Sequence, residues 1–129
     1  MGSRSTGRKL AMQALYQADL RNEDIENIVE DFLIASEYAD QTKNWAIELV
    51  RPIWENLEEL DKLIQKYAIG WKLERINHID RNILRIAFHE LSTMKTDIGI
   101  VINEAVELAK KYSTDESPKF INGILGNYV

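Results

Sequence analysis

The chain has 129 residues, of which 45% are hydrophobic and 29% are charged, and its formal net charge is −5. This length corresponds to one domain that can bury a full core, and the composition is that of a globular rather than a disordered protein. The absence of cysteine excludes disulfides, thiol catalysis and cysteine-based zinc sites. Because no apolar run could span a membrane or act as a secretory signal, we expect a cytoplasmic protein without membrane contact.

Basic residues are concentrated at the N-terminus. The first 21 residues contain four basic residues and one acidic residue, namely Arg4, Arg8, Lys9, Arg21 and Asp19. This segment therefore carries +3, which leaves −8 for the rest of the chain. Such an arrangement suits local contact with a polyanion better than binding through bulk charge. The alternative is a solvated tail without function, because basic tails are common.

Apolar residues recur every three or four positions, which predicts an all-α fold, and the first helix is expected at about 5–20. Its core face is formed by Leu10, Ala11, Ala14, Leu15 and Ala18. Tyr16 lies one to two turns beyond Lys9 and away from the centre of that face. An aromatic ring beside cations is typical of single-stranded RNA binding, in which the ring stacks on a base. Alternatively, Tyr16 packs at the edge of the core with its hydroxyl in water.

The middle of the chain predicts three further helices. Residues 24–38 form one, and residues 40–67 form a longer one in which Pro52 predicts a kink or a split. Its acidic residues, which have no histidine nearby, are expected to form a solvated face rather than a metal site: Glu55, Glu58, Glu59 and Asp61. After Gly70 and a short turn at 72–76, Asn77 and Asp80 resemble a capping box for a helix that continues to Leu91.

The last third of the chain, residues 98–125, reads as a helix, a short acidic loop and a second helix. Ser117 is expected to cap the second helix with its hydroxyl, and Pro118 suits its first position. Polar residues among the apolar ones are interpreted as structural, because buried amides and carboxylates between helices must be hydrogen-bonded: Asn103, Glu104 and Asn122.

No enzyme signature is present. The chain lacks a phosphate-binding glycine loop, and Thr93 stands where a zinc-protease helix starting at His89 would need its second histidine. With His78 as the only other histidine, no local pattern supports a nucleophile and its base. We therefore predict a binding protein without catalytic activity, cofactor or metal, in which His89 packs at a helix surface.

Several blocks of the sequence, in the right order and with the right gaps, resemble the NusB transcription antitermination family. The blocks are residues 8–17, 71–76, 83–91, 102–110 and 119–125. The resemblance implies an all-α fold of about seven helices in two packed helical subdomains. It implies a single RNA-binding domain, with an N-terminal helical half of about 1–69 and a C-terminal half of about 70–129.

The resemblance also implies a role without catalysis. Members of the family bind the boxA element of ribosomal RNA leader transcripts together with the ribosomal protein NusE. With other Nus factors and RNA polymerase they prevent early termination. A monomer or a weak homodimer is expected, and no cofactor.

The RNA-binding residues that the resemblance implies are Arg4, Arg8, Lys9, Tyr16, Asp80, Glu116, Lys119 and Phe120. They are expected to lie close together in space. Two of them have alternatives, since Asp80 could only cap its helix and Phe120 could belong to the core. Carboxylates accept hydrogen bonds from base amino groups, so Asp80 and Glu116 would serve sequence choice rather than affinity.

The chain departs from the family pattern in three places. The N-terminal arginine run is thin, which predicts weaker and less salt-dependent RNA binding. Gly99 replaces a frequent proline and leaves the start of its helix less fixed. Glu116 is longer than the expected aspartate.

Two other functions remain open from the sequence. A similar helical domain precedes the catalytic domain of some ribosomal RNA cytosine methyltransferases, so the chain could be an RNA-targeting module. The length counts against this, because no catalytic domain follows. The chain could also be a helical interaction protein that does not bind RNA.

Overall fold

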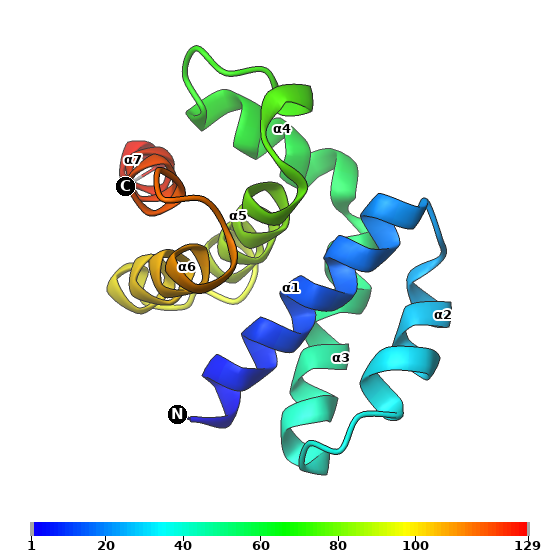
Figure 1. Ribbon diagram of the computed structural model, residues 1–129. Helices are drawn as coiled ribbons and strands as arrows, with labels where there is room; N and C mark the ends of the chain where they lie inside the picture. The colour runs from blue at the N-terminus through cyan, green and yellow to red at the C-terminus, as the bar shows by residue number, and fades with distance from the viewer. Residues whose placement is uncertain (1, 129) are drawn as a thin grey trace. The chain divides into compact units, whose positions relative to one another are not determined.

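The computed structural model describes residues 2–128, and in this part of the chain all regular structure is helical (Figure 1). The seven α-helices are α1 (Ser3–Arg21), α2 (Ile25–Ile28), α3 (Asp40–Glu55), α4 (Leu57–Tyr67), α5 (His78–Ser92), α6 (Ile98–Tyr112) and α7 (Ser117–Tyr128). A π-helical segment, η1 (Val29–Ile34), follows α2, and a 3-10 turn, η2 (Leu73–Arg75), precedes α5. The predicted all-α fold with seven helices is confirmed. None of the described helices combines the length and the apolar character that crossing a membrane requires.

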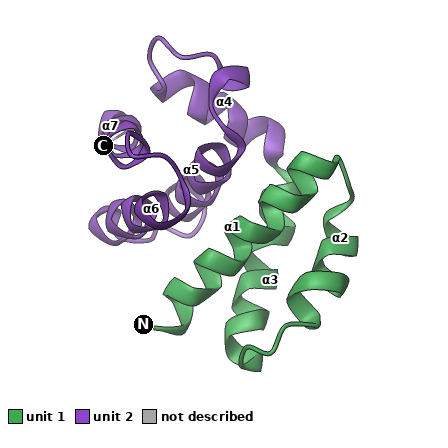
Figure 2. Ribbon diagram, viewed as in Figure 1, with its two compact units in different colours: residues 1–56 green, residues 57–129 purple. Residues whose placement is uncertain are grey.

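The chain divides into two compact units, residues 1–56 and residues 57–129 (Figure 2). The resemblance implied helical halves that meet near residue 69. In the structure α4 packs with α5 and α7, which accounts for its place in the second unit. Each unit is described by itself below.

In unit 1, α1 packs against α3 and α2 (Figure 1). The predicted core face of α1 is buried, with Leu10 at 2% exposure and Leu15 at 0%. The helix expected at 24–38 instead changes from α to π geometry at Val29 and ends at Ile34. Val29 and Leu33 are both buried. Apolar spacing over six residues is compatible with both geometries, so the sequence could not distinguish them.

The split predicted near Pro52 is confirmed, and it lies at Asn56, between α3 and α4. Pro52 occupies the last turn of α3, where its missing N–H removes one helical hydrogen bond. The N–H of Asn56 is shared between the carbonyls of Pro52 and Ile53, both at 3.1 Å. α3 therefore ends one turn beyond the proline.

In unit 2, α5 packs against α4, α6 and α7, and its residues from Asn82 to Leu91 are all buried. Arg85 on this helix forms a two-pronged ion pair with Asp61 of α4, at 2.8 Å for Nε–Oδ1 and 2.9 Å for Nη2–Oδ2. The expectation that Asp61 belongs to a solvated acidic face was wrong. The sequence pattern of α4 could not reveal this role of Asp61, because the buried arginine that needs a carboxylate lies on another helix.

His89 is buried at 4% exposure, so its expected position at a helix surface was also wrong. Burial lowers the pKa of His89 below its usual value, and the neighbouring Glu90 carboxylate opposes this only in part. The buried Nδ1 atom has no hydrogen-bond partner in the described structure. The fold therefore holds this imidazole neutral near pH 7.

We expect the free energy of unfolding to fall as the pH is lowered through about 6.5. The unfolded chain then takes up a proton at His89, which the folded chain resists until the pH reaches its own lower pKa. The slope from this one group is at most about 1.4 kcal/mol per pH unit. Urea unfolding at pH 7.5, 6.5 and 5.5 measures it, and His89→Leu should flatten the curve. An unchanged slope in His89→Leu would assign the pH dependence to other groups.

Candidate nucleic-acid interface

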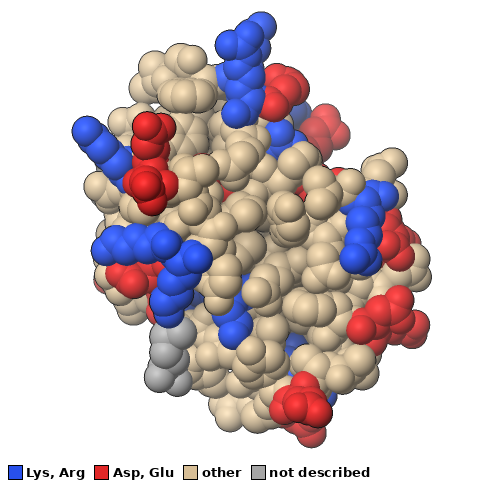
Figure 3. Space-filling view, in the orientation of Figure 1, with Lys and Arg blue, Asp and Glu red and all other residues tan. Residues whose placement is uncertain are grey.

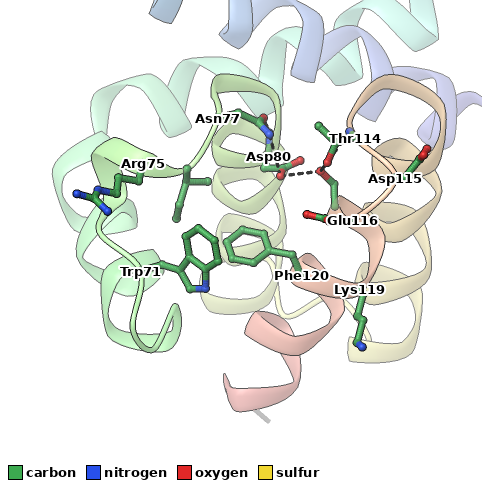
Figure 4. Close-up of a pocket in the computed structure, with 11 residues that line it drawn as sticks. Trp71, Arg75, Asn77, Asp80, Thr114, Asp115, Glu116, Lys119 and Phe120 are labelled. Atoms are coloured by element: carbon green, nitrogen blue, oxygen red, sulfur yellow. Dashed lines mark hydrogen bonds between the residues drawn. The ribbon is translucent and has the colours of Figure 1, made fainter.

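A cavity of about 590 Å³ opens in unit 2, between the segment before α5 and the α6–α7 loop (Figure 4). Arg75 lies on the side of Trp71, the Phe120 ring lies next to Trp71, Asp80 lies at the back, and Glu116 lies on the side of the α6–α7 loop. Four of the predicted RNA-binding residues therefore line this cavity, namely Asp80, Glu116, Lys119 and Phe120. We refer to this cavity as the unit 2 pocket.

Two aromatic rings form one wall of the unit 2 pocket. Trp71 and Phe120 meet edge to face, with ring centroids 5.1 Å apart and an angle of 70° between the planes. Trp71 is 50% exposed, and Phe120 is half-buried. Phe120 is thus neither a fully buried core residue nor an isolated surface ring. The exposed tryptophan face can stack on a planar ligand.

The side chain of Gln65 on α4 holds the loop that carries Trp71 through hydrogen bonds to the loop backbone. The Gln65 side-chain amide donates to the carbonyl of Trp71 at 2.5 Å, and its oxygen accepts from the N–H of Leu73 at 2.9 Å. Gly70 turns the chain with a φ of +83°, a conformation that favours glycine. Trp71 is therefore presented by a defined loop, although half of its surface is exposed.

Asp80 is 4% exposed, and its carboxylate joins the start of α5 to the α6–α7 loop. It accepts hydrogen bonds from Ser113 Oγ at 2.6 Å, from Ser117 Oγ at 2.8 Å and from Asn77 Nδ2 at 3.1 Å. Asn77 caps α5 through the N–H of Asp80 at 2.8 Å, as predicted. The returning bond ends on the Asn77 side chain, so the motif differs from a standard capping box. Asp80 thus does more than cap its helix.

Ser117 does not cap α7 in the predicted way. Its hydroxyl donates to Asp80 and accepts from the N–H of Thr114 at 3.3 Å. Ser113 also donates its hydroxyl proton to Asp80. Both serine protons are therefore used, so the 2.9 Å contact between the two serine oxygens is not a hydrogen bond. The hydroxyl of Thr114 donates to Ser117 Oγ at 2.8 Å. The predicted cap was wrong because spacing does not reveal the buried carboxylate that competes for this hydroxyl.

Charged side chains of both signs surround the unit 2 pocket. Glu116 and Lys119 are exposed, and Lys119 extends away from the two rings (Figure 4). Arg75 is also exposed and lies on the side of Trp71. The pocket therefore offers a stacking surface, nearby cations and carboxylate acceptors, which are the groups that contact unstacked bases and phosphates of RNA.

The other predicted residues lie on α1 in unit 1. Arg4 is exposed, whereas Tyr16 is half-buried, as expected for a ring at the core edge. Lys9 is half-buried and donates to Tyr38 Oη at 2.7 Å. Arg8 is only 4% exposed, and its guanidinium carbon lies 5.1 Å from the centre of the Trp45 ring. Trp45, 37 positions later, thus covers Arg8, and the role of Arg8 in RNA binding stays a prediction.

Basic side chains do not form a single broad patch on the face drawn in Figure 3, where Lys and Arg are interspersed with Asp and Glu. This agrees with the negative net charge of the whole chain.

The structural roles predicted for Asn103 and Asn122 were wrong. Both side chains are exposed, and they line a shallow groove of about 560 Å³ between α6 and α7 together with Ile102 and Lys119. Glu104 is half-buried. The start of α6 is fixed by Asp97, which accepts from the N–H of Gly99 at 2.9 Å. The helical period shows that a polar residue lies outside the core face of its own helix. It does not show whether a neighbouring helix covers that residue.

Sequence reasoning did not select Trp71, Arg75 or Asn77 as pocket residues. Trp71 and Arg75 could have been found, because an aromatic residue after a helix-ending glycine and among cations is a pattern of RNA-binding surfaces. Asn77 was recognised only as a helix cap. The predicted site residues thus form two groups, one in each unit.

Comparison with known proteins gives consistent matches over nearly the whole chain. The NusB family model matches residues 5–129. Transcription antitermination protein NusB of a Nitratiruptor species is 42% identical over 97% of this chain and 90% of its own length. The protein of the same name from Alkaliphilus oremlandii is 42% identical over 98% of this chain and 93% of its own length.

Solved structures agree. T. maritima NusB aligns with a TM-score of 0.86 and 41% identity, covering 98% of this chain and 89% of that one. A crystal structure of antitermination factors NusB and NusE in complex with dsRNA contains a similar chain, with a TM-score of 0.82 and 31% identity. That alignment covers 98% of this chain and 95% of the other.

Proposed function

Because the chain belongs to the NusB family, we propose that it is a transcription antitermination factor that binds boxA RNA of ribosomal RNA leader transcripts together with NusE. The observation that carries this proposal is the match to proteins of that name over nearly the full length of both chains. The similar chain in a complex of NusB, NusE and dsRNA supports the choice of partners.

In this proposal the protein works by assembly and not by catalysis. It holds one RNA element and one ribosomal protein, so that each raises the affinity of the other. Other Nus factors and RNA polymerase complete the complex, which places the protein in the cytoplasm, where transcription occurs. The small number of cations in the N-terminal segment supports this cooperative scheme, because few phosphate contacts there give weak RNA binding when the protein acts alone.

The unit 2 pocket supports RNA binding through its rings and its hydrogen-bonding groups. One unstacked base would lie against Trp71 and Phe120, which already meet edge to face. The exposed carboxylate of Glu116 would accept from a base amino group. Asp80 already accepts three hydrogen bonds, so its contribution would be to hold the pocket in shape.

The experiment is a titration with boxA-like RNA and with a scrambled RNA of the same composition, at two salt concentrations, with and without NusE. We expect tighter binding to boxA-like RNA and a further gain when NusE is present. Equal affinity for both RNAs, unchanged by NusE, would reject the proposed function. Such a result would favour a helical interaction protein that does not bind RNA.

Single ring removals test the assigned residues. Tyr16→Ala, Trp71→Ala and Phe120→Ala should each weaken boxA binding by about 1–3 kcal/mol, the usual loss for one stacked base. Ile69→Ala is the matched control, because Ile69 is 74% exposed, lies two residues before Trp71 and carries no ring. Thermal unfolding accompanies each titration. If Phe120→Ala unfolds the protein, Phe120 belongs to the core instead.

A further inference from the structure

Each of the three basic residues Arg4, Arg8 and Lys9 on α1 rests on an aromatic ring from another segment of unit 1. The guanidinium carbons of Arg4 and Arg8 lie 5.8 Å and 5.1 Å from the centre of the Trp45 ring. The ammonium of Lys9 lies 4.8 Å from the centre of the Tyr38 ring and donates to its hydroxyl. Trp45 is on α3, and Tyr38 is in the turn before it. We call Trp45 and Tyr38 the aromatic brace.

Gly7 allows this arrangement. It lies between Arg4 and Arg8 on the same face of α1, and an ideal Cβ there would be 2.6 Å from Cε3 of Trp45. No real side chain makes so close a contact, so any other residue would push the indole away. Glycine also weakens a helix interior relative to alanine. At this position α1 therefore accepts a poorer helix former, and the indole lies directly against its backbone.

The brace leaves the cations able to bind an anion. A guanidinium that stacks on a ring uses its flat face, and its N–H groups at the edges remain directed outward. Arg4 is exposed and borders a cavity of about 290 Å³, whose other lining residues are Ser3, Gln41, Asn44, Trp45 and the acidic Glu48. The Lys9 ammonium has three donors, of which one is used by Tyr38. Arg8 is buried, and its guanidinium also lies over the indole.

Pre-ordering has a physical benefit for an N-terminal segment with few cations. A long basic side chain loses rotamer freedom when it binds a phosphate, and this loss weakens binding. A cation that is already held on a ring loses less. Two or three braced cations can therefore contribute as much as a larger number of mobile ones.

We propose that Trp45 and Tyr38 are positioning residues that hold Arg4 and Lys9 in place for the phosphates of RNA. The inference rests on the proposed function, in that RNA is the polyanion. It adds the means by which unit 1 binds with a thin basic segment. The brace itself is tested on phosphate chains without bases.

The first test measures binding of inorganic polyphosphate at low salt. Trp45→Leu should weaken it about threefold to tenfold, as expected when the order of two side chains is lost. Tyr38→Leu should have a smaller effect. Tyr38→Phe keeps the ring and loses the hydroxyl, so its affinity should lie between those of Tyr38→Leu and the unaltered protein. Trp54→Leu is the matched control, a tryptophan on the same helix without a cation on its ring in the described structure.

Gly7→Ala is a second variant, which keeps every cation and every ring. It should favour the helix and yet weaken polyphosphate binding, because the new methyl group displaces the indole. A role in folding alone predicts that affinity follows thermal stability across these variants. The aromatic brace predicts that Gly7→Ala lowers the affinity for polyphosphate without a matching loss of thermal stability. Equal affinities of Trp45→Leu and Trp54→Leu, or no binding by the unaltered protein, would overturn the inference.

Salt dependence separates positioning from direct contact. With single-stranded boxA-like RNA, Arg4→Gln should lower the slope of log K against log salt by about 0.7, the value for one phosphate. Trp45→Leu should weaken binding at every salt concentration with the slope kept. If wild-type protein does not prefer boxA-like to scrambled RNA, the proposed function fails, and the brace is judged on polyphosphate alone.

Discussion

Replacing Asp80 by alanine should lower the free energy of unfolding by about 2–4 kcal/mol, the range for a buried and fully hydrogen-bonded polar group. The carboxylate is 4% exposed and accepts from Ser113, Ser117 and Asn77. Its removal leaves three donors without their acceptor at the junction of α5 with the α6–α7 loop. Urea unfolding at pH 7.5 measures the change.

Two further variants separate the contributions. Ser113→Ala removes one donor and should cost about 1 kcal/mol, the usual net value of a hydrogen bond. Asp80→Asn keeps the shape of the side chain but must turn an N–H₂ group toward a donor. Its loss in the free energy of unfolding should therefore lie between those of Ser113→Ala and Asp80→Ala. If Asp80→Ala unfolds at the same urea concentration as the unaltered protein, the network does not stabilise the fold.

Asp61→Ala should lower the free energy of unfolding by about 3 kcal/mol, because it leaves the buried Arg85 guanidinium without its carboxylate. Arg85 is 3% exposed, and Asp61 holds it through two short hydrogen bonds. The Asp61 side chain is 22% exposed, which places the expected cost at the lower end for a buried pair. Urea or thermal unfolding measures it.

The matched test is the double variant Asp61→Ala with Arg85→Met. Without the arginine no buried guanidinium remains that needs the Asp61 carboxylate, so the double variant should regain much of the stability that Asp61→Ala loses. If the double variant lost as much free energy of unfolding as Asp61→Ala and Arg85→Met together, the pair itself would contribute little. The surface pair of Arg51 with Glu26, at 2.9 Å and half exposed, is a control whose removal should cost below about 1 kcal/mol.

The helical period was sufficient to predict the fold. Positions such as Leu10, Leu15, Ile83 and Ile121 recur at helical spacing, and each is buried. Gly70 and Pro52 marked where helices end or divide, because their backbone restrictions act locally. The π-helical turn at η1 and the exact unit boundary could not be predicted, since both depend on packing between elements.

The candidate site was predicted less well, because its chemistry depends on contacts between residues distant in sequence. Spacing placed Arg8 beside Lys9 but could not show that Trp45 covers it. It identified Asp80 as part of a helix start but not its bonds to Ser113 and Ser117, more than 30 positions away. Phe120, a predicted RNA-binding residue, lines the unit 2 pocket, whereas its edge-to-face partner Trp71 was not among the predicted residues.

The way in which Gln65 holds the loop before α5 has a consequence for how this surface can change. Both of its hydrogen bonds end on backbone atoms, the carbonyl of Trp71 and the N–H of Leu73. The loop conformation therefore does not depend on which side chain stands at position 71. A substitution at position 71 can therefore change this wall of the pocket, and with it the preference for a ligand, while the two hydrogen bonds that hold the loop are kept.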